Sequence, residues 1–176
     1  MRTDPLTLTY RKDYHVPDFW IDQVQLHFRL HDDHTLVDAT IMFHRNLETG
    51  SAANPLVLAG RELETLAVEL NGVPLAATQY EITAEQLTLL EVPEVFTLKT
   101  QVRIHPEQNT SLEGLYQSNG MFCTQCEAES FRRITWSLDR PDVMACYTVT
   151  LEAEQAKFPV LLSNGNCVDS GVSENG

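Results

Sequence analysis

Apolar and polar residues alternate with a period of two along three long stretches of the chain. Residues 24–30 read V-Q-L-H-F-R-L, residues 37–43 read V-D-A-T-I-M-F, and residues 96–105 read F-T-L-K-T-Q-V-R-I-H. Alternation of this kind is typical of a strand that buries one face and exposes the other. The polar tetrapeptide H-D-D-H at 31–34 separates the first two stretches, so we expect them to form an antiparallel hairpin.

Shorter strand patterns fill the intervals between and after these stretches. They occupy residues 66–70, 86–90 and 147–151, and the first of them ends at Asn71-Gly72. Residues 128–133 alone read as helical. Closely spaced strands separated by turn residues favour an antiparallel all-β fold over alternating β-α-β units. We therefore predict one domain over residues 1–176, an all-β antiparallel sandwich with one short helix.

The end of the chain carries one more turn signal. The sequence S-N-G-N at 163–166 is typical of a hairpin turn, and a new strand pattern begins at Cys167-Val168. The sequence stops soon afterwards at Gly176. We therefore expect the domain to be truncated near its C-terminal end.

The charge balance excludes two classes of partner. The chain has 25 acidic residues against 12 Lys and Arg, a formal net charge of −13 at pH 7. This charge repels phosphate backbones and anionic lipids, so neither nucleic acid nor a membrane surface is expected as a partner. No apolar run reaches the roughly 18 residues of a membrane span, and residues 1–14 lack the apolar centre of a signal peptide. The sequence therefore predicts a cytoplasmic protein.

Two short motifs contain potential metal ligands. His31 and His34 flank two aspartates, and Cys123 and Cys126 form a C-x-x-C pair. The first motif is more typical of a solvated hairpin tip than of a metal site. A structural zinc site needs a second close pair of Cys or His, which the sequence lacks, and a redox pair needs a helix after a parallel strand. We expect reduced structural thiols and no metal in this chain; a redox or metal pair remains the alternative.

Polar and acidic residues are dense between Leu112 and Asp142. A structural interpretation makes this segment a long connection across the end of the sandwich, held by ion pairs among Arg132, Arg133, Asp139, Arg140 and Asp142. Composition alone favours that interpretation over a functional one. The chain contains no H-E-x-x-H, P-loop, G-x-S-x-G or glycine-rich dinucleotide motif, so we predict no catalytic residue within it.

Five motifs carry a family resemblance. They read Y-R-K-D-Y at 10–14, N-T-S-L-E-G-L-Y-Q-S at 109–118, C-T-Q-C-E-A-E at 123–129, L-D-R-P-D at 138–142 and L-L-S-N-G-N at 161–166. With these motifs the chain closely resembles the N-terminal domain of gluzincin zinc aminopeptidases of the bacterial aminopeptidase N (alanyl aminopeptidase) type. The likeness extends over essentially the whole chain.

The resemblance implies a β-rich, saddle-shaped domain that lies over a thermolysin-like catalytic domain. In such enzymes the catalytic domain carries the zinc motif H-E-x-x-H and a substrate-binding G-A-M-E-N loop, neither of which occurs in residues 1–176. The resemblance therefore implies zinc as the cofactor of the full-length enzyme and removal of N-terminal residues from peptides as its activity. It also implies that this chain by itself binds no zinc and is inactive.

For Gln125 and Glu127 the resemblance implies contacts with the substrate. They match the family positions that reach from the N-terminal domain into the active-site cleft. The α-amino group of a peptide is mostly charged near neutral pH, and a fixed carboxylate binds it through charge-assisted hydrogen bonds. Glu127 would supply this carboxylate and Gln125 would orient the first residue. Their spacing predicts an extended segment with both side chains on one side and Cys126 directed into the packing.

Two hypotheses follow for the function of the chain. In the first, it is the substrate-gating N-terminal domain of a cytoplasmic zinc aminopeptidase, with the peptide N-terminus and the remaining catalytic and C-terminal domains as its partners. In the alternative, it is a free-standing acidic β-sandwich that binds a partner without peptidase activity.

Overall fold

The computed structural model describes residues 10–49 and 54–173 of the 176-residue chain, almost all of them as strands and loops. Within these residues the elements are η1 Arg11–Asp13, β1 Phe19–Leu30, β2 Thr35–Arg45, η2 Leu47–Thr49, β3 Leu56–Ala59, β4 Glu64–Leu70, β5 Val73–Pro74, β6 Tyr80–Ile82, β7 Gln86–Leu89, β8 Val95–Ile104, β9 Gly114–Ser118, β10 Met121–Gln125, η3 Phe131–Arg133 and β11 Cys146–Ala153, where η marks a 3-10 helix. The all-β prediction is confirmed.

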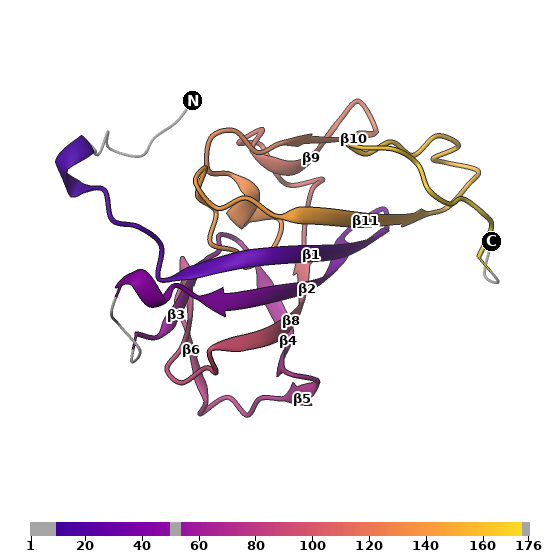
Figure 1. Cartoon of the computed structure of the whole chain (residues 1–176). Coiled ribbons are helices and arrows are strands. Elements are labelled where there is room, and N and C mark those ends of the chain that lie inside the picture. Colours follow the sequence, from indigo (N-terminus) through magenta and orange to yellow (C-terminus); the bar gives the residue numbers. More distant parts are fainter. Residues whose placement is uncertain (1–9, 50–53, 174–176) are drawn as a thin grey trace.

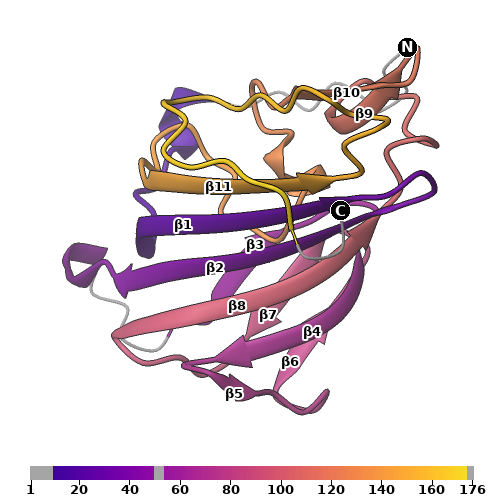
Figure 2. The same cartoon turned by 90° about the vertical axis from the view of Figure 1, so that its right-hand side faces the viewer.

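The strands form one large sheet, one small sheet and a separate hairpin. The large sheet has the order β11-β1-β2-β8-β4-β5, and the small sheet has the order β3-β7-β6. Figure 2 shows the small sheet behind the large one, with the β9–β10 hairpin beyond the β11 edge. The predicted β1–β2 hairpin is confirmed, and its tip is closed by the His31 N–H, which donates to the His34 carbonyl oxygen at 3.0 Å.

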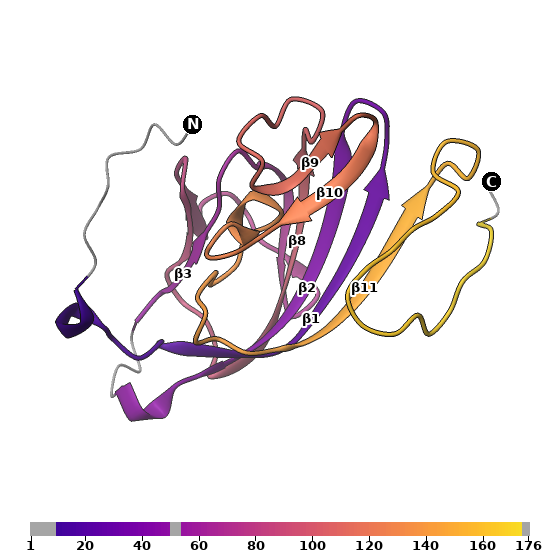
Figure 3. The same ribbon diagram turned by 90° about the horizontal axis from the view of Figure 1, so that it is seen from above.

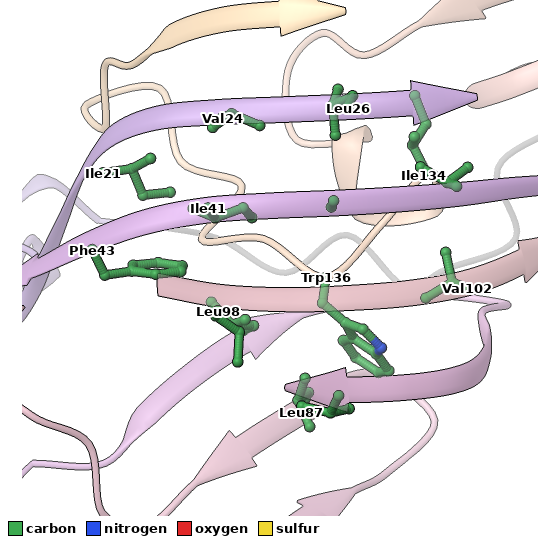
Figure 4. Close-up of a cluster of buried hydrophobic side chains, with 14 of the residues drawn as sticks. Ile21, Val24, Leu26, Ile41, Phe43, Leu87, Leu98, Val102, Ile134 and Trp136 are labelled. Atoms are coloured by element: carbon green, nitrogen blue, oxygen red, sulfur yellow. The ribbon is translucent and has the colours of Figure 1, made fainter. Parts of the chain in front are cut away.

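The core lies between the two sheets, as the period of two requires. On β8 every second residue from Phe96 to Ile104 is buried. These side chains share a cluster with Leu58 and Leu87 of the small sheet and with Trp136, part of which Figure 4 shows. Full burial of one such side chain contributes roughly 1.5–3 kcal/mol, so this cluster supplies most of the driving force for stacking the sheets.

One strand pairing differs from the expected antiparallel arrangement. β11 pairs with β1 in parallel, from Gln23 opposite Cys146 to Leu30 opposite Ala153. A parallel neighbour requires a crossover connection, and residues 31–145, which include all the other strands, separate β1 from β11. The polar alternation is the same for either direction of pairing, so the sequence pattern did not reveal it. Figure 3 shows β11 alongside β1 at this edge.

The predicted helix at 128–133 is reduced to a turn followed by η3. Residues 127–130 form turns, and η3 contains only Phe131–Arg133. Six residues are too few to offset the cost of nucleating an α-helix in the absence of flanking helical structure. No helix among residues 10–49 and 54–173 is long and apolar enough to cross a membrane.

The strand expected from Cys167 is not formed. Residues 164–165 do bend, with Gly165 at φ +87°, but residues 166–173 have irregular backbone without strand pairing. A strand needs a neighbour for its backbone N–H and C=O groups, and the described part of the chain offers none here. Residues 159–173 are exposed throughout.

Candidate functional site

The β9–β10 hairpin carries the first of the two predicted site residues. Its two-residue turn is Asn119-Gly120, with φ of +50° and +77°. Positive φ at both positions is the geometry whose twist matches paired strands, and Asn-Gly adopts it readily. The ladder runs from Met121 opposite Ser118 to Gln125 opposite Gly114. Gln125 therefore lies at the open end of the hairpin. Figure 1 shows the β9–β10 hairpin above β11, the edge strand of the large sheet.

A tight turn carries the second site residue. The Cys126 carbonyl oxygen accepts hydrogen bonds from the backbone N–H groups of Glu129 at 3.1 Å and Ser130 at 3.0 Å. Ser130 is buried, whereas Glu127 and Glu129 are exposed. We refer to residues 126–130 as the acidic turn. It anchors its two ends in the fold and leaves Glu127 at the surface.

The structure confirms the packing predicted for Cys126, but the extended backbone predicted for residues 125–127 ends at Gln125. Both side chains are exposed, and Cys126 between them is half-buried against the core cluster. However, β10 ends at Gln125, so Glu127 lies in the acidic turn and not on an extended segment. The turn begins there because the Cys126 carbonyl bonds locally, three and four residues ahead, and not to a neighbouring strand.

Arginines neutralise most of the acids in this part of the chain. Of the five acidic residues between 112 and 142, four form ion pairs: Glu113–Arg133 at 3.3 Å, Glu129–Arg132 at 3.2 Å, Asp139–Arg132 at 2.5 Å and Asp142–Arg140 at 2.7 Å. The structural interpretation of this segment is thus confirmed for these residues. The fifth acid is Glu127, and within residues 10–49 and 54–173 its carboxylate has neither an ion pair nor a hydrogen bond.

Asp142 connects this segment to the start of the described chain. Its two oxygens accept from Arg140 Nε at 2.9 Å and Nη2 at 2.7 Å, and one also accepts from the Tyr14 hydroxyl at 3.0 Å. The Arg140 hydrogen bonds hold the pKa of the Asp142 carboxyl below its usual range, although partial burial opposes them. The connection is therefore fixed at both ends by charge-assisted bonds.

The two cysteines of the C-x-x-C pair are half-buried. Cys123 and Cys126 are free, and the Cys123 thiol makes only a long contact of 3.9 Å with the Met121 carbonyl oxygen. Burial raises the pKa of the Cys126 thiol to about 11, with the nearby Asp139 charge adding to the shift. A thiol that stays protonated at neutral pH is a poor nucleophile and a poor metal ligand.

The His, Cys, Asp and Glu side chains that the structure describes do not form a metal centre. Across residues 10–49 and 54–173, no group of three or more His, Cys, Asp or Glu side chains is arranged to hold a metal ion. At the β1–β2 tip the His31 and His34 rings stack at 4.6 Å, and His34 Nδ1 lies 2.7 Å from an Asp33 oxygen. Asp32 pairs with Lys157 at 2.6 Å, so these side chains are engaged within the protein.

A surface pocket that the sequence did not predict is lined in part by residues 132–140. It has a volume of about 330 Å³, and its lining includes Phe19, Gly60, Arg132, Leu138 and Arg140 but neither site residue. Its three arginines are all paired: Arg132 with Asp139, Arg140 with Asp142 and Arg61 with Glu85. The pocket therefore adds no unpaired charge to the site.

The sequence matches a known domain family over nearly its whole length. The model of the peptidase M1 N-terminal domain matches residues 12–176. The chain belongs to this family.

Relatives of this M1 N-terminal domain are bacterial aminopeptidases. It is 47% identical to aminopeptidase N of Caulobacter vibrioides over 100% of the chain, and 46% identical to aminopeptidase N of Escherichia coli over 95% of it. These matches cover 20% and 19% of the relatives. The chain thus spans about a fifth of the length of the curated relatives that it matches.

Solved structures agree with the fold. Legionella pneumophila aminopeptidase A in complex with aspartic acid superposes with a TM-score of 0.84 at 32% identity, over 90% of this chain and 19% of that one. The Deinococcus radiodurans M1 zinc metallopeptidase bound to a Tyr-Ser-Ala substrate matches with a TM-score of 0.63 at 18% identity, over 77% and 33% of the two chains. The second likeness concerns the fold alone.

Proposed function

We propose that this M1 N-terminal domain works within a longer zinc aminopeptidase, where Glu127 and Gln125 bind the free N-terminus of a peptide. The observation that carries the proposal is the unpaired Glu127 carboxylate. Its four acidic neighbours in the segment are neutralised by arginines, so Glu127 alone retains its capacity to bind a cation. The match to aminopeptidases supports the same conclusion.

The chemistry of a peptide N-terminus suits these two side chains. An α-ammonium group has three donors, and the Glu127 carboxylate can accept from it with charge assistance. Gln125 contributes an amide that both donates and accepts, so it can orient the first residue of the peptide. When the catalytic part of the enzyme covers this surface, loss of water strengthens the attraction between the carboxylate and the ammonium. A peptide with a blocked N-terminus lacks the charge and is rejected.

Zinc and the hydrolytic groups belong, in this proposal, to the part of the enzyme outside this chain. The donor set of the described residues does not fit zinc. The domain contributes substrate recognition and no chemical step, so the chain by itself is expected to cleave no alanyl substrate. A cytoplasmic location remains a prediction, which fractionation of the source cells tests.

The decisive experiment is the substitution Glu127→Gln in the full-length enzyme. It preserves shape and removes the charge. We expect kcat/KM for an unblocked alanyl substrate to fall by an amount equivalent to about 2–4 kcal/mol of transition-state binding. Glu81→Gln, at an exposed acid on β6, is the matched control and should behave as the wild type. Unchanged kinetics in the Glu127 variant would refute the proposal.

The free-standing binding module remains the second candidate and has a simple test of its own. An antibody against this chain should detect a protein several times its size in a lysate of the source cells. A band no larger than the chain would favour the binding module and redirect attention to the ligand of its acidic surface.

A further inference from the structure

We propose that Arg132 is a positioning residue for substrate recognition, because it ties the acidic turn that carries Glu127 to the buried Asp139 carboxylate. The inference rests on the proposed role of Glu127. It assigns a function to an ion-pair network that otherwise looks purely structural. Three residues form this network: Asp139, Arg132 and Glu129.

Asp139 is the fixed end of the network. Only 6% of its side chain is exposed, and one carboxylate oxygen accepts from both Arg132 Nε at 2.5 Å and the Arg132 backbone N–H at 3.1 Å. The Arg132 Nη2 also lies 3.4 Å from the Asp139 carbonyl oxygen. Bonding to both the side chain and the backbone of one residue fixes the direction of the guanidinium group.

Glu129 is the end that reaches the site. Its carboxylate, with 57% of the side chain exposed, lies 3.2 Å from Arg132 Nη2. Glu129 is two residues beyond Glu127 in the same turn, so a constraint on Glu129 is a constraint on the path of the backbone at Glu127. The guanidinium group thus joins a buried anchor to the exposed tip of the acidic turn.

The backbone gives independent evidence that these contacts hold an unfavourable conformation. Glu129 has φ +132° and Asp139 has φ +36°, in the region that residues other than glycine rarely adopt. Such conformations persist where the surrounding contacts determine them, and they concentrate at functional sites. Both acids that pair with Arg132 therefore have a positive φ.

The neighbouring Arg133 packs against the hairpin that carries Gln125. Its side chain is 9% exposed and pairs with Glu113 and Glu62, and a Cβ on Gly114 would lie only 2.6 Å from the Arg133 Cβ. Because Gly114 is the ladder partner of Gln125, Arg133 packs against the strand that supports Gln125. Consecutive arginines therefore secure the supports of the two substrate contacts, Arg132 for Glu127 and Arg133 for Gln125.

Positioning matters here because recognition of an α-ammonium depends on distance and direction. A carboxylate that moves by about 1 Å loses its hydrogen-bond geometry to the ammonium, so it holds the substrate less tightly. The network acts through Glu127 and touches no substrate itself. Its removal should therefore weaken binding without altering the chemical groups.

The test compares the single variants Glu129→Gln and Arg132→Lys of the full-length enzyme with the variant that carries both changes. Each change is also made in an enzyme that already carries Glu127→Gln. Glu129 is exposed, so its variant keeps the fold even if the Arg132 variant does not. We expect each single change to raise KM for an unblocked peptide by about three- to tenfold with kcat within about twofold of the wild type. The Glu129/Arg132 double variant should be no worse than the single ones, because both break the same link. In an enzyme that already carries Glu127→Gln, neither change should raise KM further.

Glu64→Gln is the control for loss of an ion pair elsewhere, because it breaks the pair with Arg103 on the large sheet. It should leave KM unchanged. If Glu129→Gln and Arg132→Lys have wild-type KM, or if their effects add in full to that of Glu127→Gln, the positioning role is overturned while the role of Glu127 stands. If Glu127→Gln itself has no effect, the proposed function fails and the inference fails with it.

Discussion

The Glu127 and Glu129 carboxylates lie two residues apart in one turn, but only that of Glu129 has an arginine partner, the Arg132 Nη2 at 3.2 Å. An exposed acid next to a guanidinium group ordinarily pairs with it, because the pairing is mildly favourable. Here Arg132 is already directed by Asp139 toward Glu129. The fold thus neutralises the neighbouring acid and keeps Glu127 available for a positive group from outside this chain.

The first prediction concerns Gly114, the ladder partner of Gln125. Gly114 has φ +71° and lies against Arg133, whereas Gly120, at the hairpin turn, has φ +77° and nothing within 4 Å of the position that a Cβ would take. Alanine at either position is strained, but only at 114 does it also clash. We expect Gly114→Ala to lower the free energy of unfolding by about 2–4 kcal/mol and Gly120→Ala by about 1 kcal/mol. Urea denaturation of the two variants measures this; equal losses would show that the contact with Arg133 is unimportant.

The second prediction is a pH dependence from Asp142. Its folded-state pKa is depressed, chiefly by the Arg140 hydrogen bonds, so it contributes stability above its ordinary pKa. That contribution is lost as the pH falls through the folded-state pKa, below about pH 4. Asp142→Asn should therefore cost about 1 kcal/mol at pH 7 and progressively less below pH 4. Unfolding measured from pH 7 to pH 2.5 checks it. A difference between the two proteins that stays constant with pH would contradict the assigned cause.

The third prediction orders the cysteines by reactivity. With a pKa of about 11, the Cys126 thiol is about 0.1% ionised at pH 8, and it is also half-buried. Cys146 and Cys167 are exposed. At pH 8 iodoacetamide should label these two well before Cys126, and the order should disappear in denaturant. Peptide mapping by mass spectrometry over a time course provides the measurement, and early labelling of Cys126 in the folded protein would contradict its packing.

Much of this fold could be predicted from the alternation of apolar and polar residues. The features that the alternation did not predict have physical causes. The alternation along β1, β2 and β8 predicted both the strands and their buried faces, because a period of two fixes which side chains share a side. It carries no information on the direction of a neighbour, so the parallel pairing of β11 with β1 was missed. The spacing of Gln125 and Glu127 predicted an extended segment, but the local hydrogen bonds of the Cys126 carbonyl form a turn there, which the spacing could not reveal.

Ion pairs between residues close in sequence could be predicted, whereas those between residues far apart in sequence could not. The sequence predicted that Arg132, Arg133, Asp139, Arg140 and Asp142 form a network, on composition alone. Adjacent partners such as Arg140 and Asp142 follow from chain proximity. Arg133 reaches Glu62, which is 71 residues away, and that pairing depends on how the hairpin meets the large sheet. The role of Glu129 had no sequence signal, because its positive φ becomes visible only in the folded backbone.

The last prediction separates backbone strain from substrate positioning at Glu129. Glycine tolerates a φ of +132° without the steric penalty that glutamate incurs, so Glu129→Gly should leave the free energy of unfolding unchanged or raise it by up to about 1 kcal/mol. The same variant loses the link to Arg132 and frees the acidic turn. We therefore expect kcat/KM of the full-length enzyme to fall about as far as in Glu129→Gln, with stability and activity moving in opposite directions.

Leu112→Gly is the matched control, since Leu112 also has positive φ, at +59°, is exposed, and lies in the same connection. It should relieve strain similarly and leave kcat/KM unchanged. Thermal unfolding and steady-state kinetics on the same preparations give both quantities. A Glu129→Gly variant that lost stability together with activity would mean that Glu129 supports the fold in general. A Glu129→Gly variant that kept full activity would contradict the positioning role of Arg132. It would show that Glu127 binds the substrate equally well when the acidic turn is not held by Arg132.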